Sequence, residues 1–367
     1  MKWLCGLFLC ISSFLLFAEP LSSATWGFQI DIPEDFSFVE GDAINSFGFQ
    51  FPNGAFLVLR IYNDGRTLDT AVSTATRQLN NNGQIVFFDY YRKKAALLAL
   101  QFQNYNGEGL CIELAQQGTT TPILLALVYS TKEGSSIRLF HRSVLNSIIP
   151  TPAEQLLPGP VSIAEYPRKT RISVPIYGTS LHAFVYDNDA EAAQAVVDME
   201  FEVMNSYTDS PHWQNAWKRM YRMLYRDSFD RIANIAFMLE RLWQQPETDI
   251  RVTAQQALNW VQSFTYERET NDSDFVNVVT AAIEGRGDCD SRVLLWAIVI
   301  EQAGIPSAIM VSKKHSHALG LADIPGDGAR FPLGDKYWLV AETTDSVELG
   351  KIAKEMSIQE DWLGINF

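Results

Sequence analysis

The stretch at residues 285–292 reads Gly-Arg-Gly-Asp-Cys-Asp-Ser-Arg, and it leads directly into the apolar run Val293–Ile300. Because glycines precede this run and a Gly-Ile-Pro sequence follows it, we expect a buried helix that begins at the cysteine. With Asp288 as the N-cap, Cys289 would occupy the first helical position, where free backbone N–H groups and the helix dipole favour a negative charge. The sequence therefore predicts a stabilised thiolate at Cys289, beside N–H groups able to receive an oxyanion.

A base for this thiol comes from the segments that follow the predicted helix. An isolated thiol has a pKa of about 8.5, so it needs a neighbouring imidazole to react at neutral pH. His315 and His317 begin a strand-like run, and because strand side chains alternate, we expect both imidazoles on one face. The next strand-like run, Lys336–Thr344, carries Glu342, a carboxylate placed to hold an imidazole in one tautomer.

This order of groups resembles a known family. A cysteine at a helix start, then a histidine and an acid on successive strands, with Gly-Asp-Cys-Asp, Ala-Gly-Ile-Pro and Glu-Thr-Thr as local sequences, is similar to the transglutaminase-like (papain-type) cysteine enzyme superfamily. The resemblance covers about residues 256–349. It implies that Cys289 is the nucleophile and that His317, which is followed by alanine, is the general base in preference to His315. It implies that Glu342 is the acid, where the family usually has aspartate in an Asp-x-Thr pattern.

The same resemblance implies an activity. We expect a cysteine hydrolase that cleaves peptide or amide bonds of a peptide or protein substrate through a Cys-His-Glu triad and a thioester acyl-enzyme, without a cofactor. Hydrolysis is favoured because water is the default acceptor where no amine site is identified. Two alternatives stay open, a protein-glutamine transglutaminase that transfers the acyl group to an amine, and an inactive binding or scaffold protein.

Several other polar residues and the second cysteine are interpreted as structural and not as catalytic. Asp288 and Asp290 are interpreted as cap and helix-start residues, and no metal is expected, because no His/Cys cluster with ligand spacing accompanies them. Tyr266 is interpreted as a core or rim residue. Cys111 lies in an apolar strand-like run and is predicted to be structural, with a Cys111–Cys289 disulfide as an alternative.

The length of the chain and a proline-rich stretch near its middle indicate an α+β protein of two domains. A chain of 367 residues suggests about two domains, and prolines between residues 150 and 160 mark the boundary. We predict a signal peptide over residues 1–24, an α+β sandwich module with an antiparallel sheet over 25–149, a Pro-rich linker over 150–170, and a transglutaminase-like (papain-type) domain over 171–367. The first module loosely resembles a PsbP-like sandwich, which would imply an accessory or binding role. Its expected strands are Trp26–Ile32, Phe47–Phe51, Ala55–Ile61, Ile85–Tyr90, Ala95–Phe102, Leu110–Ala115 and Ile123–Tyr129, and its helices Thr67–Leu79 and Gly134–Ile149.

The second domain begins with a helical region. Helical periodicity predicts helices over Ala190–Tyr207, His212–Tyr225, Asp227–Gln244 and Val252–Phe264. A basic run lies on these helices, and we expect it to form a solvated helix surface. The run consists of Lys218, Arg219, Arg222 and Arg226.

The net charge bears on which partners the protein can bind, and the N-terminal segment bears on where in or outside the cell it is located. With 29 Lys+Arg against 43 Asp+Glu, a formal net charge of −14 and a sequence pI near 4.8, nucleic-acid binding is disfavoured. Met1 and Lys2 precede a short apolar run typical of a secretory signal, with cleavage expected before Thr25 or, as a second site, after Ala18. We therefore expect an exported protein, periplasmic or extracellular or peripheral to a membrane, without a later membrane span. A retained N-terminal anchor is the alternative.

Overall fold

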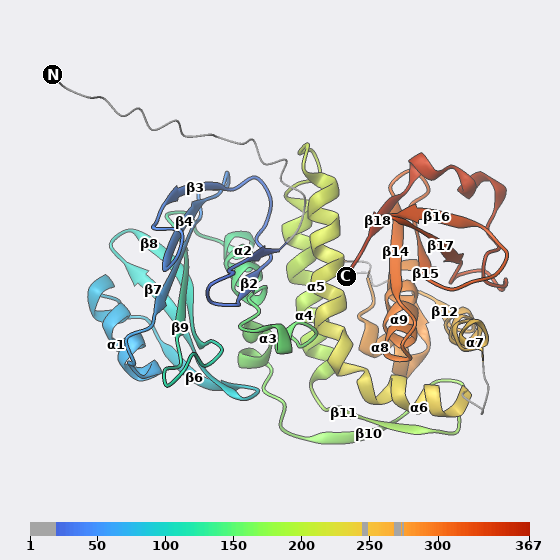
Figure 1. Ribbon diagram of the computed structural model, residues 1–367, viewed down its shortest axis with the longest axis horizontal. Helices are drawn as coiled ribbons and strands as arrows, with labels where there is room; N and C mark the ends of the chain where they lie inside the picture. Colours follow the sequence, from blue (N-terminus) through green and yellow to red (C-terminus); the bar gives the residue numbers. More distant parts are fainter. Residues whose placement is uncertain (1–19, 244–248, 268–272, 274) are drawn as a thin grey trace.

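The computed structural model describes residues 20–243, 249–267, 273 and 275–367, and these form a mixed α+β protein as the sequence predicts (Figure 1). Most of the predicted signal peptide, residues 1–19, lies outside the described residues. The described residues contain two larger sheets, which stand on either side of a layer of helices. No helix in the described part combines the length and apolar character needed to cross a membrane.

The N-terminal half is built on an antiparallel sheet of order β3-β4-β5-β9-β8-β7-β6, as predicted. Side chains alternate across the sheet, so Leu110 and Ile112 belong to one buried cluster and Cys111 to another. Helix α1 (Leu68–Leu79) covers the Cys111 face, and α2 (Ser135–Asn146) covers the other. The strands are β3 (Ser37–Glu40), β4 (Ser46–Gln50), β5 (Phe56–Tyr62), β6 (Ile85–Tyr90), β7 (Lys93–Phe102), β8 (Tyr105–Glu113) and β9 (Ile123–Ser130).

The C-terminal half contains a smaller antiparallel sheet of order β16-β17-β15-β14-β18, against which the buried helix α9 (Cys289–Gln302) packs. Three two-stranded pairs, β1–β2, β10–β11 and β12–β13, complete the described strands. The bounds in the main sheet are β14 (Ser307–Ser312), β15 (His317–Ala322), β16 (Arg330–Leu333), β17 (Lys336–Ala341) and β18 (Leu363–Ile365). Those of the pairs are β1 (Leu21–Ser22), β2 (Gln29–Ile30), β10 (Arg171–Pro175), β11 (His182–Tyr186), β12 (Thr265–Tyr266) and β13 (Arg286–Gly287).

Two long helices separate the sheets, and their bounds differ from the expected ones. We predicted two helices, over His212–Tyr225 and Asp227–Gln244, with a break at Arg226. In the structure α5 (Trp213–Arg231) continues through Arg226, so the break before α6 (Ala233–Trp243) falls at Ile232. Helices α4 and α5 pack against each other between the two halves (Figure 1). The remaining bounds are α4 (Asp189–Asn205), α7 (Ile250–Gln262), α8 (Val278–Glu284), and the 3-10 turns η2 (Lys354–Ser357) and η3 (Gln359–Asp361).

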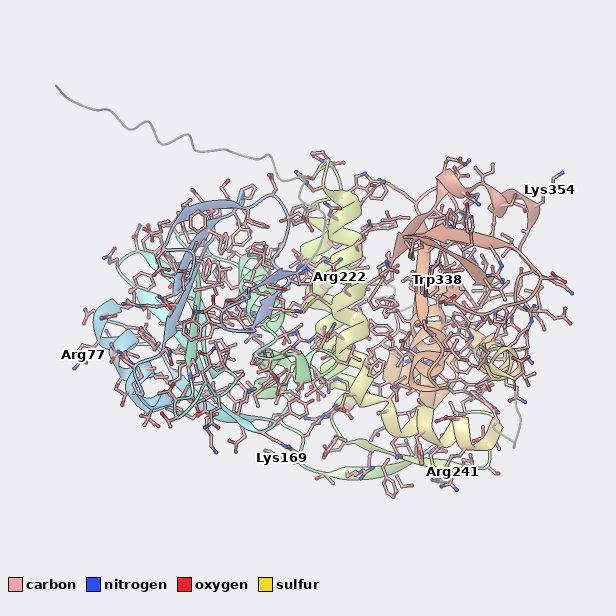
Figure 2. The ribbon with its side chains drawn as sticks, viewed as in Figure 1. Arg77, Lys169, Arg222, Arg241, Trp338 and Lys354 are labelled. Atoms are coloured by element: carbon pink, nitrogen blue, oxygen red, sulfur yellow. The ribbon has the colours of Figure 1, made fainter. Side chains whose placement is uncertain are left out.

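The basic run on α5 is not the solvated surface that its composition suggests. Arg219 and Arg226 are only 2% and 6% exposed. Arg226 donates hydrogen bonds to backbone carbonyls of the N-terminal half, including Asn146 O at 3.1 Å and Ile148 O at 3.0 Å. The expectation was wrong because α5 lies between the two halves, where Figure 2 shows Arg222. These arginines therefore satisfy buried oxygen acceptors across the contact between the halves.

The Pro-rich segment 150–170 is folded rather than an extended spacer. It contains the 3-10 turn η1 (Pro152–Glu154) and helix α3 (Pro160–Glu165), and Val161 is 2% exposed. The hydroxyl of Tyr90 donates a hydrogen bond of 2.8 Å to Pro158 O, which fixes the segment to the sheet. One buried cluster runs from the N-terminal sheet through α2, α4 and α5 to α9, so the two halves share a continuous core.

Candidate active site

Cys289 begins α9, as the sequence predicts. Asp288 is the N-cap, and its Oδ1 accepts hydrogen bonds from the backbone N–H of Ser291 at 2.8 Å and from the Ser291 hydroxyl at 2.7 Å. Gly285 ends the preceding helix α8 with a φ of +66°, and a Cβ there would lie 2.2 Å from the ring of Tyr177. This glycine is therefore required by the backbone turn that delivers the cysteine to the helix start.

The thiol of Cys289 is buried and surrounded by carboxylates. Cys289 is 2% exposed, and its Sγ donates a hydrogen bond to Asp290 Oδ2 at 3.5 Å. The backbone amide of Ala318 also acts on this sulfur and lowers its pKa. Burial, followed by the charges of Asp290 and Asp288, raises the pKa of the thiol. The predicted stabilised thiolate is therefore not the resting state, because burial and two carboxylates outweigh the helix end and the Ala318 amide.

His317 and Glu342 come together as the sequence predicts. His317 is the first residue of β15, Glu342 directly follows β17, and these two strands are antiparallel neighbours. The His317 Nε2 and Glu342 Oε2 atoms lie 2.8 Å apart, and Glu342 Oε1 accepts from the Thr344 N–H at 2.7 Å and hydroxyl at 2.6 Å. Although burial raises the Glu342 pKa, the hydrogen bonds from His317 and Thr344 hold it below its ordinary value. The carboxylate is thus ionised and fixed in orientation.

His315 has other polar partners than His317, although both rings lie against Trp362. His315 lies in the turn before β15, and Ser316 between the two histidines adopts a left-handed φ of +48°. The His315 ring stacks on Trp362, and its Nε2 lies 3.3 Å from Asp361 Oδ2. Strand alternation does not explain this shared neighbour, because His315 precedes the strand and lies in a turn.

Helix α9, which begins at Cys289, lies very close to β15, which begins at His317. A Cβ on Gly320 of β15 would lie 2.4 Å from Trp296 Cζ3 of α9, so only a glycine allows this approach. The Trp296 indole N–H donates to Ala254 O at 3.1 Å, which locks the ring in place. The backbone amide of Ala318, the residue after His317, is one of the groups that lower the pKa of the Cys289 thiol, so the start of β15 lies near the thiol.

Arg292 is a site residue that the sequence analysis did not identify. It is 1% exposed, and it donates hydrogen bonds to Gly287 O at 3.0 Å, Phe264 O at 2.8 Å and Thr343 O at 3.4 Å. Arg292 thereby connects Gly287, two residues before the cysteine, to Thr343, the residue after Glu342. Its position three residues after the cysteine was visible in the sequence, but its carbonyl partners were not. Tyr266, 51% exposed, lies on the rim with its ring centroid 5.5 Å from the Arg292 guanidinium carbon.

Comparisons with known proteins place the chain in no family. No family model matches it, and no curated protein matches it. Among solved structures, it is similar to a crystal structure from Bacteroides thetaiotaomicron, with 13% identity over 56% of this chain and 76% of that chain and a TM-score of 0.23. It is also similar to red sea bream transglutaminase, with 12% identity over 76% of this chain and 52% of that chain and a TM-score of 0.17. The similarity to a transglutaminase is therefore weak.

A cavity of about 260 Å³ adjoins the site, between α4, α5 and the C-terminal sheet. His317 and Asp290 form part of its wall, and so does Tyr221, whose hydroxyl donates a hydrogen bond to Asp290 Oδ1. Tyr221 is 5% exposed and comes from α5, a helix to which the sequence analysis assigned no role in the site. The helical region before the predicted catalytic core therefore supplies one side of the site.

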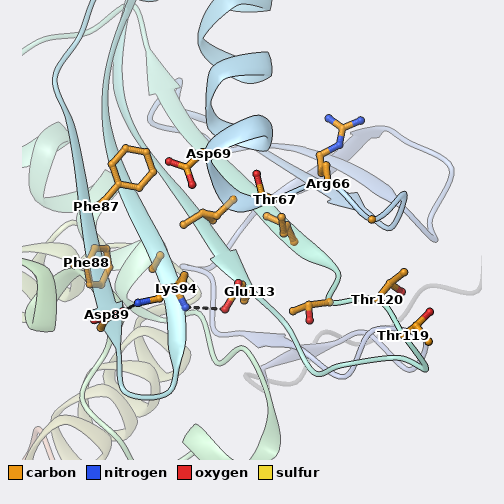
Figure 3. A pocket seen from close by; sticks show the side chains of 15 residues that line it. Arg66, Thr67, Asp69, Phe87, Phe88, Asp89, Lys94, Glu113, Thr119 and Thr120 are labelled. Atoms are coloured by element: carbon orange, nitrogen blue, oxygen red, sulfur yellow. Dashed lines mark hydrogen bonds and ion pairs between the residues drawn. The ribbon is translucent and has the colours of Figure 1, made fainter.

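A larger and more open hollow of about 620 Å³ lies on the N-terminal sheet (Figure 3). The charges in it are compensated locally, since Lys94 Nζ lies 2.6 Å from Asp89 and the Lys94 N–H donates to Glu113 at 2.8 Å. Its described lining contains no cysteine or histidine. Because no nucleophile–base pair lies there, the smaller cavity beside His317 is the candidate active site despite its size.

The second cysteine, Cys111, lies away from the candidate active site. Cys111 and Cys289 are both free thiols, so the alternative of a disulfide between them is wrong. Cys111 is buried at 0% exposure in β8, where burial raises its pKa to about 12, as expected of a structural thiol. In the part of the chain that the structure describes, no group of three or more His, Cys, Asp or Glu side chains is arranged to hold a metal ion.

Proposed function

We propose that this protein is a cysteine hydrolase of peptide or amide bonds, with Cys289 as nucleophile, His317 as general base and Glu342 as the residue that positions His317. The observation that carries the proposal is the 2.8 Å contact of His317 Nε2 with Glu342, at the start of the strand against which the Cys289 helix packs. A carboxylate fixed at Nε2 holds the proton there, which leaves Nδ1 with the lone pair of a base. We also propose that the C-terminal half is a transglutaminase-like domain.

The reaction follows from the protonation states. Because the resting thiol is neutral, His317 removes its proton as the sulfur attacks the substrate carbonyl, rather than before. The S–C bond forms, and the C–N bond breaks as the protonated imidazole gives its proton to the departing amine. Water then attacks the thioester with His317 again as base, and the products are a carboxylic acid and the free thiol. Glu342 stays ionised and stabilises the imidazolium in both steps.

Trapping of the acyl-enzyme tests the proposal. Incubation of the full chain with p-nitrophenyl esters of N-acetyl amino acids should add one acyl group to Cys289, detected by intact mass and peptide mapping. Cys289→Ala should abolish the adduct and His317→Ala should slow it strongly, whereas the matched variant His315→Ala should leave it unchanged. An adduct on another residue, or one insensitive to His317→Ala, would overturn the assignment. Ammonia release with and without a primary amine then separates hydrolysis from transamidation.

A second candidate is a binding or scaffold protein without catalysis. The observation in its favour is the 2% exposure of Cys289, together with a pKa raised by burial and two carboxylates. It is supported if the protein binds peptides with the same affinity before and after Cys289→Ala and turns none of them over. Export, to the periplasm or outside the cell, is part of both proposals, because the predicted leader is independent of the site.

A further inference from the structure

The cavity beside His317 has a mainly apolar wall. Two helices that precede the catalytic segment supply most of its apolar side chains, and these include two methionines, whose flexible thioethers adapt to ligands of different shape. Ser316 and Lys313, both exposed, line the side that faces solvent. The apolar side chains from α4 and α5 are Val197, Phe201, Met204, Trp217, Met220 and Leu224.

The size of the cavity suits one side chain. Pockets for drug-sized molecules have volumes of about 300–1,000 Å³, whereas an apolar cavity of about 150 Å³ is enough to hold benzene. At about 260 Å³, this cavity holds one aromatic or branched aliphatic side chain with little space left. Polar groups in its wall include Asp290, which accepts a hydrogen bond from the thiol, Tyr221, which donates to Asp290, and His317.

We propose that this cavity is the specificity pocket of the site, and that it takes the apolar side chain of the substrate residue whose carbonyl is attacked. The inference rests on the proposed function for the identity of the attacked bond. Its position follows from the wall that it shares with His317 and Asp290. We expect acidic side chains to be disfavoured, because they would lose their hydration beside the negatively charged Asp290, whereas the cation Lys313 lies only on the side that faces solvent.

Binding to a protein that cannot react tests the pocket. With full-length Cys289→Ala, we expect N-acetyl-phenylalanine amide and N-acetyl-leucine amide to bind about ten- to 100-fold more tightly than N-acetyl-alanine amide, since burial of each methylene is worth about fourfold in affinity. N-acetyl-glutamate amide should bind no better than the alanine compound. Calorimetry or the fluorescence of Trp217 in the pocket wall would measure the affinities.

Two pocket variants and one control assign the binding to this cavity. In the Cys289→Ala background, Val197→Phe fills the cavity and should abolish the preference for phenylalanine, and Phe201→Ala should weaken phenylalanine binding several-fold. Phe201→Ala keeps the test decisive if the filled variant does not fold. Phe237→Ala, at a 49% exposed helix position outside the cavity, should change nothing.

The outcomes separate this inference from the proposed function. Equal affinity for the alanine and phenylalanine amides, or a preference that survives both pocket variants, would refute the pocket. An intact preference in a protein that forms no acyl-enzyme when Cys289 is present would uphold the pocket and refute the hydrolase.

Discussion

Asp290 Oδ2 lies 3.5 Å from Cys289 Sγ, so the thiol donates its proton toward a carboxylate and not toward free solvent. The other oxygen of Asp290 accepts a hydrogen bond from Tyr221 on α5. Burial and this charge together raise the thiol pKa, and the same burial raises the pKa of Tyr221 well above its ordinary value. The resting site therefore holds a neutral thiol that becomes nucleophilic only as its proton leaves.

Asp290→Asn should lower the pKa of Cys289, because the substitution removes the nearest negative charge and keeps an amide that can contact Tyr221. The alkylation rate of Cys289 with iodoacetamide between pH 6 and 10 is the measurement. We expect the rising limb of the profile to move to lower pH and the rate at neutral pH to increase. Asp361→Asn, at the carboxylate that contacts His315, should leave the profile in place. An unchanged profile in Asp290→Asn would show that the charge of Asp290 does not raise the pKa, which would leave burial and Asp288 as its causes.

His317→Ala should reduce kcat for a cleaved substrate by about 10²- to 10⁴-fold, the usual contribution of a general base. Glu342→Gln should reduce it less, because the imidazole remains but can adopt the wrong tautomer. Steady-state kinetics with both variants and with His315→Ala, expected to retain full activity, make the comparison. Equal losses in His315→Ala and His317→Ala would indicate a structural role for the turn.

Glu342 should also contribute to stability in a pH-dependent way. Its pKa in the folded protein lies below the ordinary value of 4.5, so the ionised form is stabilised by folding. This stabilisation is complete above pH 4.5 and is lost as the pH falls through the lower folded pKa. The Tm difference between the parent and Glu342→Gln should therefore be larger at pH 6 than at pH 3. The exposed variant Glu360→Gln serves as control, and a Tm difference that does not depend on pH would contradict the assignment.

Local patterns predicted the parts of the fold that depend on neighbours in sequence. The N-terminal strands, the Asp288 cap and the His317–Glu342 pair follow from alternation, cap chemistry and strand order. What escaped prediction depends on distant segments. Arg226 donates hydrogen bonds to the carbonyls of residues 146 and 148, and Asp290, the neighbour of Cys289, accepts one from Tyr221 on a helix almost 70 residues earlier. The sequence also does not show that Ser316 turns the chain and separates the two histidines.

Arg219→Ala should destabilise the protein by about 3–5 kcal/mol, the usual consequence of leaving a buried charge unpaired. The Arg219 guanidinium pairs with Glu200, which is 1% exposed, and it donates to Asp31 O at 2.7 Å from the N-terminal half. Urea unfolding measures the change. The double variant Arg219→Met with Glu200→Leu should recover most of the loss, because it removes both buried charges. A loss below about 1 kcal/mol in Arg219→Ala would place this arginine among the solvated charges that its sequence context suggests.

If the N-terminal segment is a cleaved leader, β1 predicts where the processed chain begins. Leu21 and Ser22 pair with Ile30 and Gln29, and the Ser23 N–H donates to Phe28 O at 2.9 Å. Cleavage before Thr25 would remove β1, whereas cleavage after Ala18 keeps it. We therefore expect the exported protein to begin at Glu19, and N-terminal sequencing or intact mass of protein recovered from an export-competent host will determine the site. A first residue of Thr25 would show that the β1–β2 pair is dispensable. A chain that keeps Met1 and fractionates with membranes would instead support the retained anchor.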